Sequence, residues 1–185
     1  MIEIRIHSRA GQGAKSAAQF IAEAAMEKGK FVQAFPEYGA ERMGAPMKVY
    51  VRISDKKIRN YSSIVAPDVV MVIDPYFIEQ IDVAEGLKES GILIVNTNKD
   101  PAEVKKITNF NGKIFALDAT KIAFETIKAN KPNTPLLGAL IKATNVVDLE
   151  EINKKIKDYF LKKLGEEKTN ANINAVARGF NETKS

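Results

Sequence analysis

A glycine turn flanked by basic residues carries the clearest chemical signal in this sequence. Between an expected strand and an expected helix it places Arg9, Gly11, Gln12, Gly13 and Lys15. Glycine allows a positive φ and a close backbone approach, and the start of a helix offers unpaired N–H groups at its positive dipole end. Such a turn binds phosphate readily. The segment therefore predicts an anion site, and a tight turn without a ligand is the competing interpretation.

Two known phosphate-binding patterns match this turn only in part. The P-loop pattern requires glycine at the positions where Arg9 and Ala14 stand. The dinucleotide fingerprint keeps its first two glycines, but Ser16 replaces the third, and Glu37 would be its ribose-binding acid. A stand-alone dinucleotide-binding reductase and a P-loop phosphotransferase therefore remain as alternative functions.

A second segment, residues 35–46, is rich in proline, glycine and aromatic residues. A loop of this length is uncommon in a compact domain unless it has a function. Tyrosine and arginine often dominate the energetics of interfaces, and proline limits the entropy lost on docking. An ordered surface loop held by a Glu–Arg pair is the alternative. We predict that a partner protein contacts Phe35, Pro36, Glu37, Tyr38, Glu41 and Arg42.

Other polar residues receive structural roles. Residues 133–140 read as a buried helix that Thr134 caps. Asp74 and Asp118 each follow an expected strand, and we expect each to cap the next helix. His7 adjoins the glycine turn but has no serine or aspartate companion for catalysis, so it is not interpreted as a base.

The composition excludes several classes of reactive site. The chain of 185 residues contains no cysteine and one histidine. Disulfides, thiol nucleophiles, zinc fingers and cysteine-ligated iron–sulfur clusters are therefore ruled out, as is a metal site made of several histidines. We expect no metal and no redox cofactor to be held by this chain alone.

The net charge of +5 is unevenly distributed along the chain. Residues 1–60 contain 11 Lys/Arg and 6 Asp/Glu, whereas residues 61–185 contain 17 of each. Nucleic-acid binding usually needs a basic stripe or an aromatic platform, and neither is obvious. A small anionic ligand or an acidic partner surface fits a localised excess better, and no nucleic acid is expected as a partner.

Targeting signals are not visible in the sequence. The first residues lack a basic region followed by a long apolar stretch, so no signal peptide is predicted. Apolar stretches are interrupted well before the roughly 20 residues that a membrane span needs. These features predict a cytoplasmic protein that does not contact a membrane.

The order of the expected elements predicts an α/β fold. The sheet should be mostly parallel, with helices on both faces, a β-hairpin insertion and a helical C-terminus. No linker or repeat divides the chain, so residues 1–185 are expected to form a single domain. Strands are expected at residues 2–7, 31–35, 47–53, 58–64, 69–73, 92–96 and 114–117, the third and fourth forming the hairpin. Helices are expected at residues 14–28, 75–87, 101–108, 120–129, 136–144, 148–164 and 170–179.

Four segments together resemble the gamma subunits of pyruvate:ferredoxin oxidoreductase, within the 2-oxoacid:ferredoxin oxidoreductase family. The resemblance extends over residues 2–180, and residues 35–46 form its most specific part. That block separates pyruvate enzymes from the 2-oxoglutarate branch of the family. The four segments read RAGQGAKSAAQFIAEAA, VQAFPEYGAERMGAPMKVYVRI, PDVVMVIDP and NTPLLGAL.

The resemblance implies an enzyme complex that converts pyruvate and coenzyme A to acetyl-CoA and CO₂ while it reduces ferredoxin. It implies thiamine diphosphate and magnesium on the alpha and beta subunits, and 4Fe–4S clusters on the beta and delta subunits. The gamma chain would serve assembly and the approach of coenzyme A, and it would be inactive alone. This agrees with the absence of cysteine and of a Gly-Asp-Gly…Asn motif for magnesium diphosphate.

The resemblance also gives the two candidate segments specific partners. Residues 35–46 are then expected to dock on the alpha, beta or delta subunit. A phosphate of coenzyme A is expected to contact Arg9, Gly11, Gln12, Gly13 and Lys15. A gamma chain can be shared between related complexes, so the sequence leaves the 2-oxo acid open.

Overall fold

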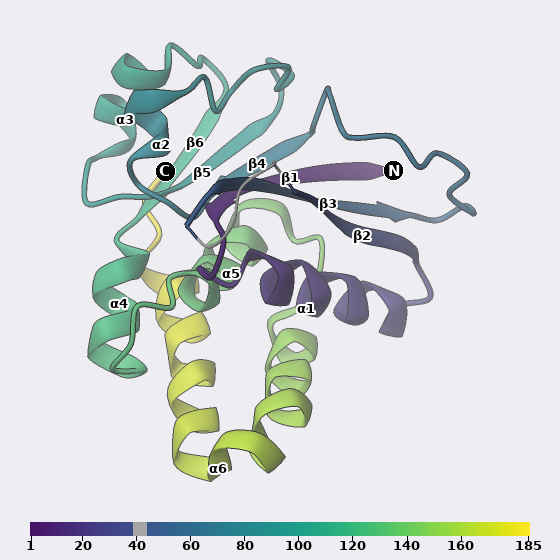
Figure 1. Cartoon of the computed structure of the whole chain (residues 1–185), viewed down its shortest axis with the longest axis vertical. Helices are drawn as coiled ribbons and strands as arrows, with labels where there is room; N and C mark the ends of the chain where they lie inside the picture. The colour runs from purple at the N-terminus through teal and green to yellow at the C-terminus, as the bar shows by residue number, and fades with distance from the viewer. Residues whose placement is uncertain (39–43) are drawn as a thin grey trace.

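A six-stranded sheet forms the centre of the computed structural model, which describes residues 1–38 and 44–185 (Figure 1). Its strands are β1 (Ile2–Arg9), β2 (Phe31–Tyr38), β3 (Pro46–Ser54), β4 (Val69–Val72), β5 (Ile92–Asn96) and β6 (Lys113–Leu117). They follow one another in the order β2-β3-β1-β4-β5-β6. Strands β1, β4, β5 and β6 pair in parallel, whereas β3 pairs antiparallel with both β1 and β2. The prediction of a mostly parallel α/β sheet is confirmed.

Helices cover both faces of the sheet, as predicted. They are α1 (Ala14–Glu27), α2 (Phe77–Gln80), α3 (Pro101–Thr108), α4 (Ala119–Thr126), α5 (Asn133–Thr144) and α6 (Leu149–Glu182). Helices α1, α4, α5 and α6 share the larger hydrophobic core, below the sheet in Figure 1, and α2 and α3 pack on the other face. Within the described ranges, no helix is both long and apolar enough to cross a membrane.

The central strands show why an uninterrupted apolar run marks a strand covered on both sides. In β4, Val69 and Met71 point into the larger core, and Val70 and Val72 point into the smaller one. Successive side chains of a strand alternate between the two faces, so both sets must be apolar when helices cover both. All four side chains are at most 1% exposed.

The hairpin is present, but not where the sequence predicted it. Residues 58–64 form no strand, and β3 pairs with β2 instead. Strand β2 also continues past Pro36, which pairs with Val49 although it was expected to end the strand. Because β2 lies at the edge of the sheet, a proline N that faces away from β3 breaks no hydrogen bond of the ladder.

One helix prediction differs from the structure, and two others describe the two parts of α6. The helix expected at residues 75–87 is reduced to α2, because Ile81 adopts an extended conformation and Asp82 accepts the Ala84 N–H in a turn. The two helices expected at residues 148–164 and 170–179 are confirmed as the two parts of α6, which are separated by non-helical backbone at Gly165. Gly165 kinks α6 with a φ of 78°, a conformation that favours glycine.

Backbone contact between α5 and α6 fixes the C-terminal part of the chain. A Cβ added to Gly138 would lie 2.1 Å from the Val176 carbonyl oxygen, and one added to Gly179 would lie 1.9 Å from the Pro135 carbonyl oxygen. Glycine at both positions lets the helices approach more closely than any side chain would allow. Beyond α6, Lys184 forms a β-bridge with Ala116 of β6.

We expect Gly179→Ala to lower the free energy of unfolding by about 3 kcal/mol, the upper range for an overpacked core. The new methyl group would overlap the Pro135 carbonyl, so the two helices must separate. Urea denaturation followed by circular dichroism measures the effect. Asn170→Ala is the matched control, because Asn170 is exposed on the same helix and should change stability by about 0.5 kcal/mol or less. Equal stabilities of the two variants would contradict the close approach.

Candidate functional site

The glycine turn lies at the carboxyl end of β1, where neighbouring connections leave the sheet toward opposite faces. The chain that follows β1 enters α1 on one face, and the chain that follows β4 enters α2 on the other. Open α/β sheets bind ligands at such a switch point. Gly11 has a φ of 99°, and Gly13, which precedes α1, has a φ of 84°, so both need glycine.

A buried carboxylate fixes the conformation of this turn. Asp74 is 3% exposed, and its Oδ2 accepts hydrogen bonds from Arg9 Nε at 2.9 Å and from Gln12 Nε2 at 3.0 Å. The Gln12 side-chain oxygen in turn accepts the Arg9 backbone N–H at 2.7 Å. The Tyr76 N–H donates to Asp74 Oδ1 at 3.0 Å in the turn before α2, but the N-cap residue of α2 is Tyr76, so Asp74 does not cap this helix as predicted.

Arg9 therefore has partners that the sequence did not predict. Arg9 was expected to contact an anionic ligand, whereas its ion pair is with Asp74. Its guanidinium carbon also lies 5.0 Å from the centre of the Phe77 ring, and Nη1 donates to the Gly44 carbonyl at 3.3 Å. Asp74 is thus a site residue whose role the sequence missed. Its place after a strand was visible, but not that this strand adjoins β1.

A cavity of about 550 Å³ opens beside the turn on the face that carries α1. Gly13 lines it, together with Lys128, Lys131 and Lys168, and Tyr159 and Phe160 belong to its apolar wall. None of the lining residues that the structure describes is acidic. The positive ends of α1 and α5 also lie here. The cavity therefore suits an anionic ligand with an apolar portion.

The cavity brings two separate sequence motifs together. A Cβ added to Gly13 would lie 2.5 Å from Asn133 Cγ, so the first residue of α5 packs directly on the glycine turn. Asn133 Oδ1 is buried and has no hydrogen-bond partner among the described residues. Thr134 does not cap α5 as predicted, because the helix already begins at Asn133 and the Thr134 hydroxyl donates to Asn172 Oδ1 at 3.4 Å.

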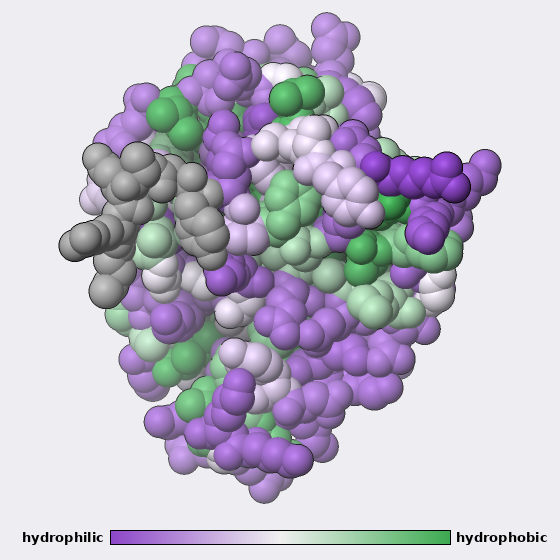
Figure 2. Space-filling view, turned by 45° about the vertical axis from the view of Figure 1, so that its right-hand side comes forward, coloured by the Kyte–Doolittle hydropathy of each residue, from purple (hydrophilic) through white to green (hydrophobic). Residues whose placement is uncertain are grey.

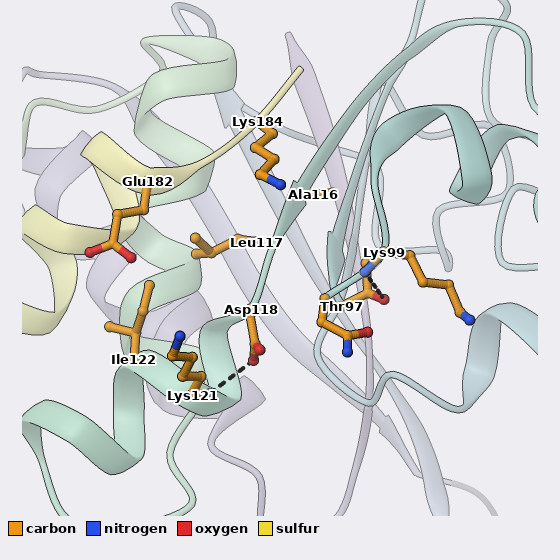
Figure 3. Close-up of a pocket in the computed structure, with 10 residues that line it drawn as sticks. Thr97, Lys99, Ala116, Leu117, Asp118, Lys121, Ile122, Glu182 and Lys184 are labelled. Carbon is orange, nitrogen blue, oxygen red and sulfur yellow. Dashed lines mark hydrogen bonds between the residues drawn. The ribbon is translucent and has the colours of Figure 1, made fainter.

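A second pocket of about 280 Å³ lies at the carboxyl ends of β5 and β6 (Figure 3). Asp118 accepts the Lys121 N–H at 2.9 Å there, which confirms its expected capping role. The pocket also contains Lys184, which forms an ion pair with Asp100, and Lys99, which forms one with Glu79. Two of its three lysines are thus paired, and Asp118 and Glu182 also line this pocket, so the cavity beside Gly13 is the better anion site.

Of the six residues predicted to contact a partner protein, four lie within the described residues and two lie outside them. Phe35 packs on Tyr50 with ring centres 5.3 Å apart. Glu37 accepts hydrogen bonds from Tyr50 at 2.8 Å and from Ser63 at 2.6 Å, and these donors lower the pKa of its carboxyl group. Glu37 therefore does not act as a ribose-binding acid beside the turn, because β3 separates β2 from β1. Tyr38 ends β2, and Glu41 and Arg42 lie outside the described residues.

A shallow groove of about 280 Å³ runs between α1 and β2. Ala18 and Ala22 form its helix side, Phe35 and Pro36 form its strand side, and Lys15 stands at its border. Figure 2 shows hydrophobic side chains at the surface in separate patches between hydrophilic ones. The groove therefore joins one predicted binding residue, Lys15, to two predicted contact residues.

His7 is buried at 3% exposure on the face of β1 opposite α1. Its Nε2 has no hydrogen-bond partner among the described residues. Burial lowers the pKa of the imidazole to about 3, with smaller contributions from Arg5 and Lys48. The ring is therefore neutral at pH 7. Within the part of the chain that the structure describes, no three histidine, aspartate or glutamate side chains gather as a metal site requires.

Sequence comparisons place this chain close to subunits of one group of enzymes. A family model described as pyruvate ferredoxin/flavodoxin oxidoreductase matches residues 3–182. A pyruvate synthase subunit PorC from Thermotoga maritima is 56% identical over 182 residues, which are 98% of this chain and 94% of that protein. The "Pyruvate/ketoisovalerate oxidoreductases common subunit gamma" of Thermococcus kodakarensis is 48% identical over 99% of this chain and 97% of its own length.

Solved structures show the same similarity. The crystal structure of a pyruvate oxidoreductase subunit PORC from Thermotoga maritima has a TM-score of 0.89 and 52% identity, covering 99% of this chain and 97% of that one. A 2-oxoglutarate:ferredoxin oxidoreductase from Magnetococcus marinus, solved with 2-oxoglutarate, coenzyme A and succinyl-CoA, has a TM-score of 0.79 and 25% identity. It aligns with 96% of this chain but only 30% of that longer one.

The low pKa of His7 makes stability depend on pH in a predictable direction. As the pH falls below about 6.5, the unfolded chain binds a proton at this histidine while the folded chain does not, so stability is lost. Because of His7, the free energy of unfolding should therefore fall by about 2 kcal/mol when the pH is lowered from 7 to 5. His7→Gln removes this contribution. Urea denaturation of both proteins at several pH values measures it, and parallel curves would contradict the low pKa.

Proposed function

This chain belongs to the pyruvate ferredoxin/flavodoxin oxidoreductase family, and we propose that it is the gamma subunit of a pyruvate:ferredoxin oxidoreductase. The complex converts pyruvate and coenzyme A to acetyl-CoA and CO₂ and reduces ferredoxin. The observation that carries this proposal is the 56% identity to a pyruvate synthase subunit over nearly the full length of both chains. The Thermococcus kodakarensis relative is named as common to pyruvate and ketoisovalerate enzymes. We therefore assign the choice of oxo acid to the partner subunits.

The redox chemistry of this enzyme belongs to other chains in our proposal. Iron–sulfur clusters need cysteine ligands, and this sequence contains none. The Gly-Asp-Gly…Asn motif for magnesium and thiamine diphosphate is also absent from the sequence. The residues of this chain therefore do not fit these groups, and we place them on the alpha, beta and delta subunits. The gamma chain supplies binding surfaces and carries no catalytic residue.

One of these surfaces is the cavity beside Gly13, which we assign to the phosphate groups of coenzyme A. Its three lysines and the starts of α1 and α5 favour negative charge, and Tyr159 provides an apolar wall. Of the residues predicted from sequence, Gly11 and Gly13 shape the turn, and Lys15 lines the groove between α1 and β2 and not the cavity. Arg9 and Gln12 act by holding the turn, since Asp74 engages both side chains.

Replacement of two cavity lysines tests this assignment. Lys131→Ala combined with Lys168→Ala, in the assembled complex, should raise the KM for coenzyme A by about tenfold or more, since hydrogen bonds to charged groups contribute about 1.5–3 kcal/mol each. The KM for pyruvate should stay unchanged. Lys121→Ala combined with Lys184→Ala is the matched control, because it removes two lysines from the pocket of Figure 3. An unchanged KM for coenzyme A in the cavity variant would contradict the assignment.

The second surface is the docking site for a partner subunit, which we assign to the end of β2 and the residues after it. Phe35 and Pro36 border the groove between α1 and β2, where an apolar side chain of a partner would be buried. Tyr38 and Arg42 are of the types that contribute most to interfaces. Phe35, Pro36, Glu37, Tyr38, Glu41 and Arg42 thus remain our predicted contacts.

Co-purification tests both the function and this surface. A tagged chain isolated from its native host should bring down the alpha, beta and delta subunits with the absorbance of iron–sulfur clusters. Tyr38→Ala combined with Arg42→Ala should weaken assembly by at least tenfold, since such residues cost about 1–2 kcal/mol or more when truncated. Isothermal titration of the chain against the remaining subunits measures this affinity.

Arg59→Ala combined with Tyr61→Ala is the matched control for assembly. It removes the same two residue types from exposed positions that are not among the predicted contacts. The control should assemble normally, and both variants should keep the circular dichroism spectrum of the original chain. Normal assembly of the Tyr38 and Arg42 variant would place the interface elsewhere, and a chain that purifies without companions would contradict the proposed function.

A further inference from the structure

We infer that Asp74 is a positioning residue for coenzyme A, which acts by holding Arg9 and Gln12 so that the glycine turn faces the cavity beside Gly13. This inference rests on the proposed function, since it takes that cavity as the coenzyme A site. Asp74 itself is 3% exposed and does not line the cavity. Its effect on the ligand must therefore pass through the side chains that it binds.

The parallel pairing of β1 with β4 brings Asp74 to the turn. His7 pairs with Val72 in this register, and the Ile73 N–H donates to the His7 carbonyl at 2.8 Å. The two strands thus end side by side, and the residue that follows β4 by two positions meets the residue that ends β1. The Arg9 ion pair and the Gln12 hydrogen bond then span the gap between the two strand ends.

The surroundings of Asp74 require a carboxylate. Its Oδ2 accepts from the Arg9 guanidinium and the Gln12 amide, and its Oδ1 accepts from the Tyr76 N–H. All three partners are donors, and an ionised carboxylate is the side chain that offers acceptors on both of its terminal atoms. An asparagine would turn its NH₂ group toward at least one of these donors and leave it unpaired.

The same contacts leave one side of the switch point open. Arg9 lies over the Phe77 ring and reaches the Gly44 carbonyl and the Gln80 side chain, so its side chain occupies the face on which α2 lies. The cavity of about 550 Å³ lies on the other face, beside α1. Asp74 thereby holds Arg9 away from the cavity and fixes the turn that borders it.

Asp74→Asn in the assembled complex tests the inference. The KM for coenzyme A should rise at least fivefold, because the turn loses its fixed conformation. The kcat at saturating coenzyme A and the KM for pyruvate should change less than twofold. Asp68→Asn is the matched control, because this carboxylate precedes the same strand and accepts the Glu3 N–H at 2.8 Å, at the opposite end of β4. It should leave the KM for coenzyme A unchanged.

Two further variants separate positioning from a general structural role. Gln12→Ala removes one partner of Asp74 and keeps the Arg9 ion pair, so it should raise the KM for coenzyme A even if the Asp74 variant fails to assemble. In the Gln12→Ala background, Asp74→Asn should raise the KM for coenzyme A by a smaller factor than it does alone, since the two residues act together. Fully independent effects would overturn the inference, and so would a Gln12→Ala variant with an unchanged KM for coenzyme A.

The cavity lysines distinguish failure of this inference from failure of the proposed function. If the lysine variants raise the KM for coenzyme A and the Asp74 and Gln12 variants do not, the site is correct and Asp74 only stabilises the fold. If none of these variants changes that KM, the coenzyme A site itself is wrong, and the inference falls with it.

Discussion

The parallel pairing of β1 with β4 is the contact on which the candidate site depends. From this pair, β1 connects through α1 to β2 on one side and β4 connects through α2 to β5 on the other, and right-handed crossovers in opposite directions leave toward opposite faces of the sheet. The chain after β1 therefore turns sharply, and Gly11 and Gly13 adopt conformations that favour glycine. The polar groups in the gap are satisfied by one buried carboxylate, that of Asp74. The strand order thus creates the switch point at the carboxyl ends of β1 and β4, and the hydrogen bonds of Asp74 fix the glycine turn beside it.

The cavity depends on a second constraint, which is the close packing of the C-terminal helices. Backbone contact at Gly138 and Gly179 holds α6 against α5, and Asn133 at the start of α5 rests on Gly13. The walls of the cavity therefore come from parts of the chain that lie more than 100 residues apart in sequence. Under the proposed function, this chain contributes to a binding site through such rigid surfaces and not through catalytic residues.

Local patterns predicted most of the fold, and the errors arose where sheet position decides the outcome. Residues 69–72 form a strand because a run buried on both faces must be apolar throughout, and this needs no knowledge of the neighbours. Pro36 was expected to end a strand, yet at an edge it breaks no ladder hydrogen bond. The hairpin partner of β3 was predicted at residues 58–64, although it is β2, because the sequence does not show which strands are neighbours in the sheet. An alternating strand shows which face is buried, but not which strand lies beside it.

The site was predictable only as far as it is local. The glycine turn follows from its own residues, whereas Asp74 and Asp118 share one local signature, and only Asp74 follows the strand beside β1. Charge is a clearer example. The positive excess of residues 1–60 suggested an anion site, but Arg5, Arg9 and Arg52 are each engaged within the fold, by two carbonyls, Asp74 and Glu3 respectively. The cations that line the cavity come instead from residues 128–168, which lie within the stretch of residues 61–185 that carries no net charge. Net charge along a sequence therefore locates a ligand only after folding has shown which cations are already paired.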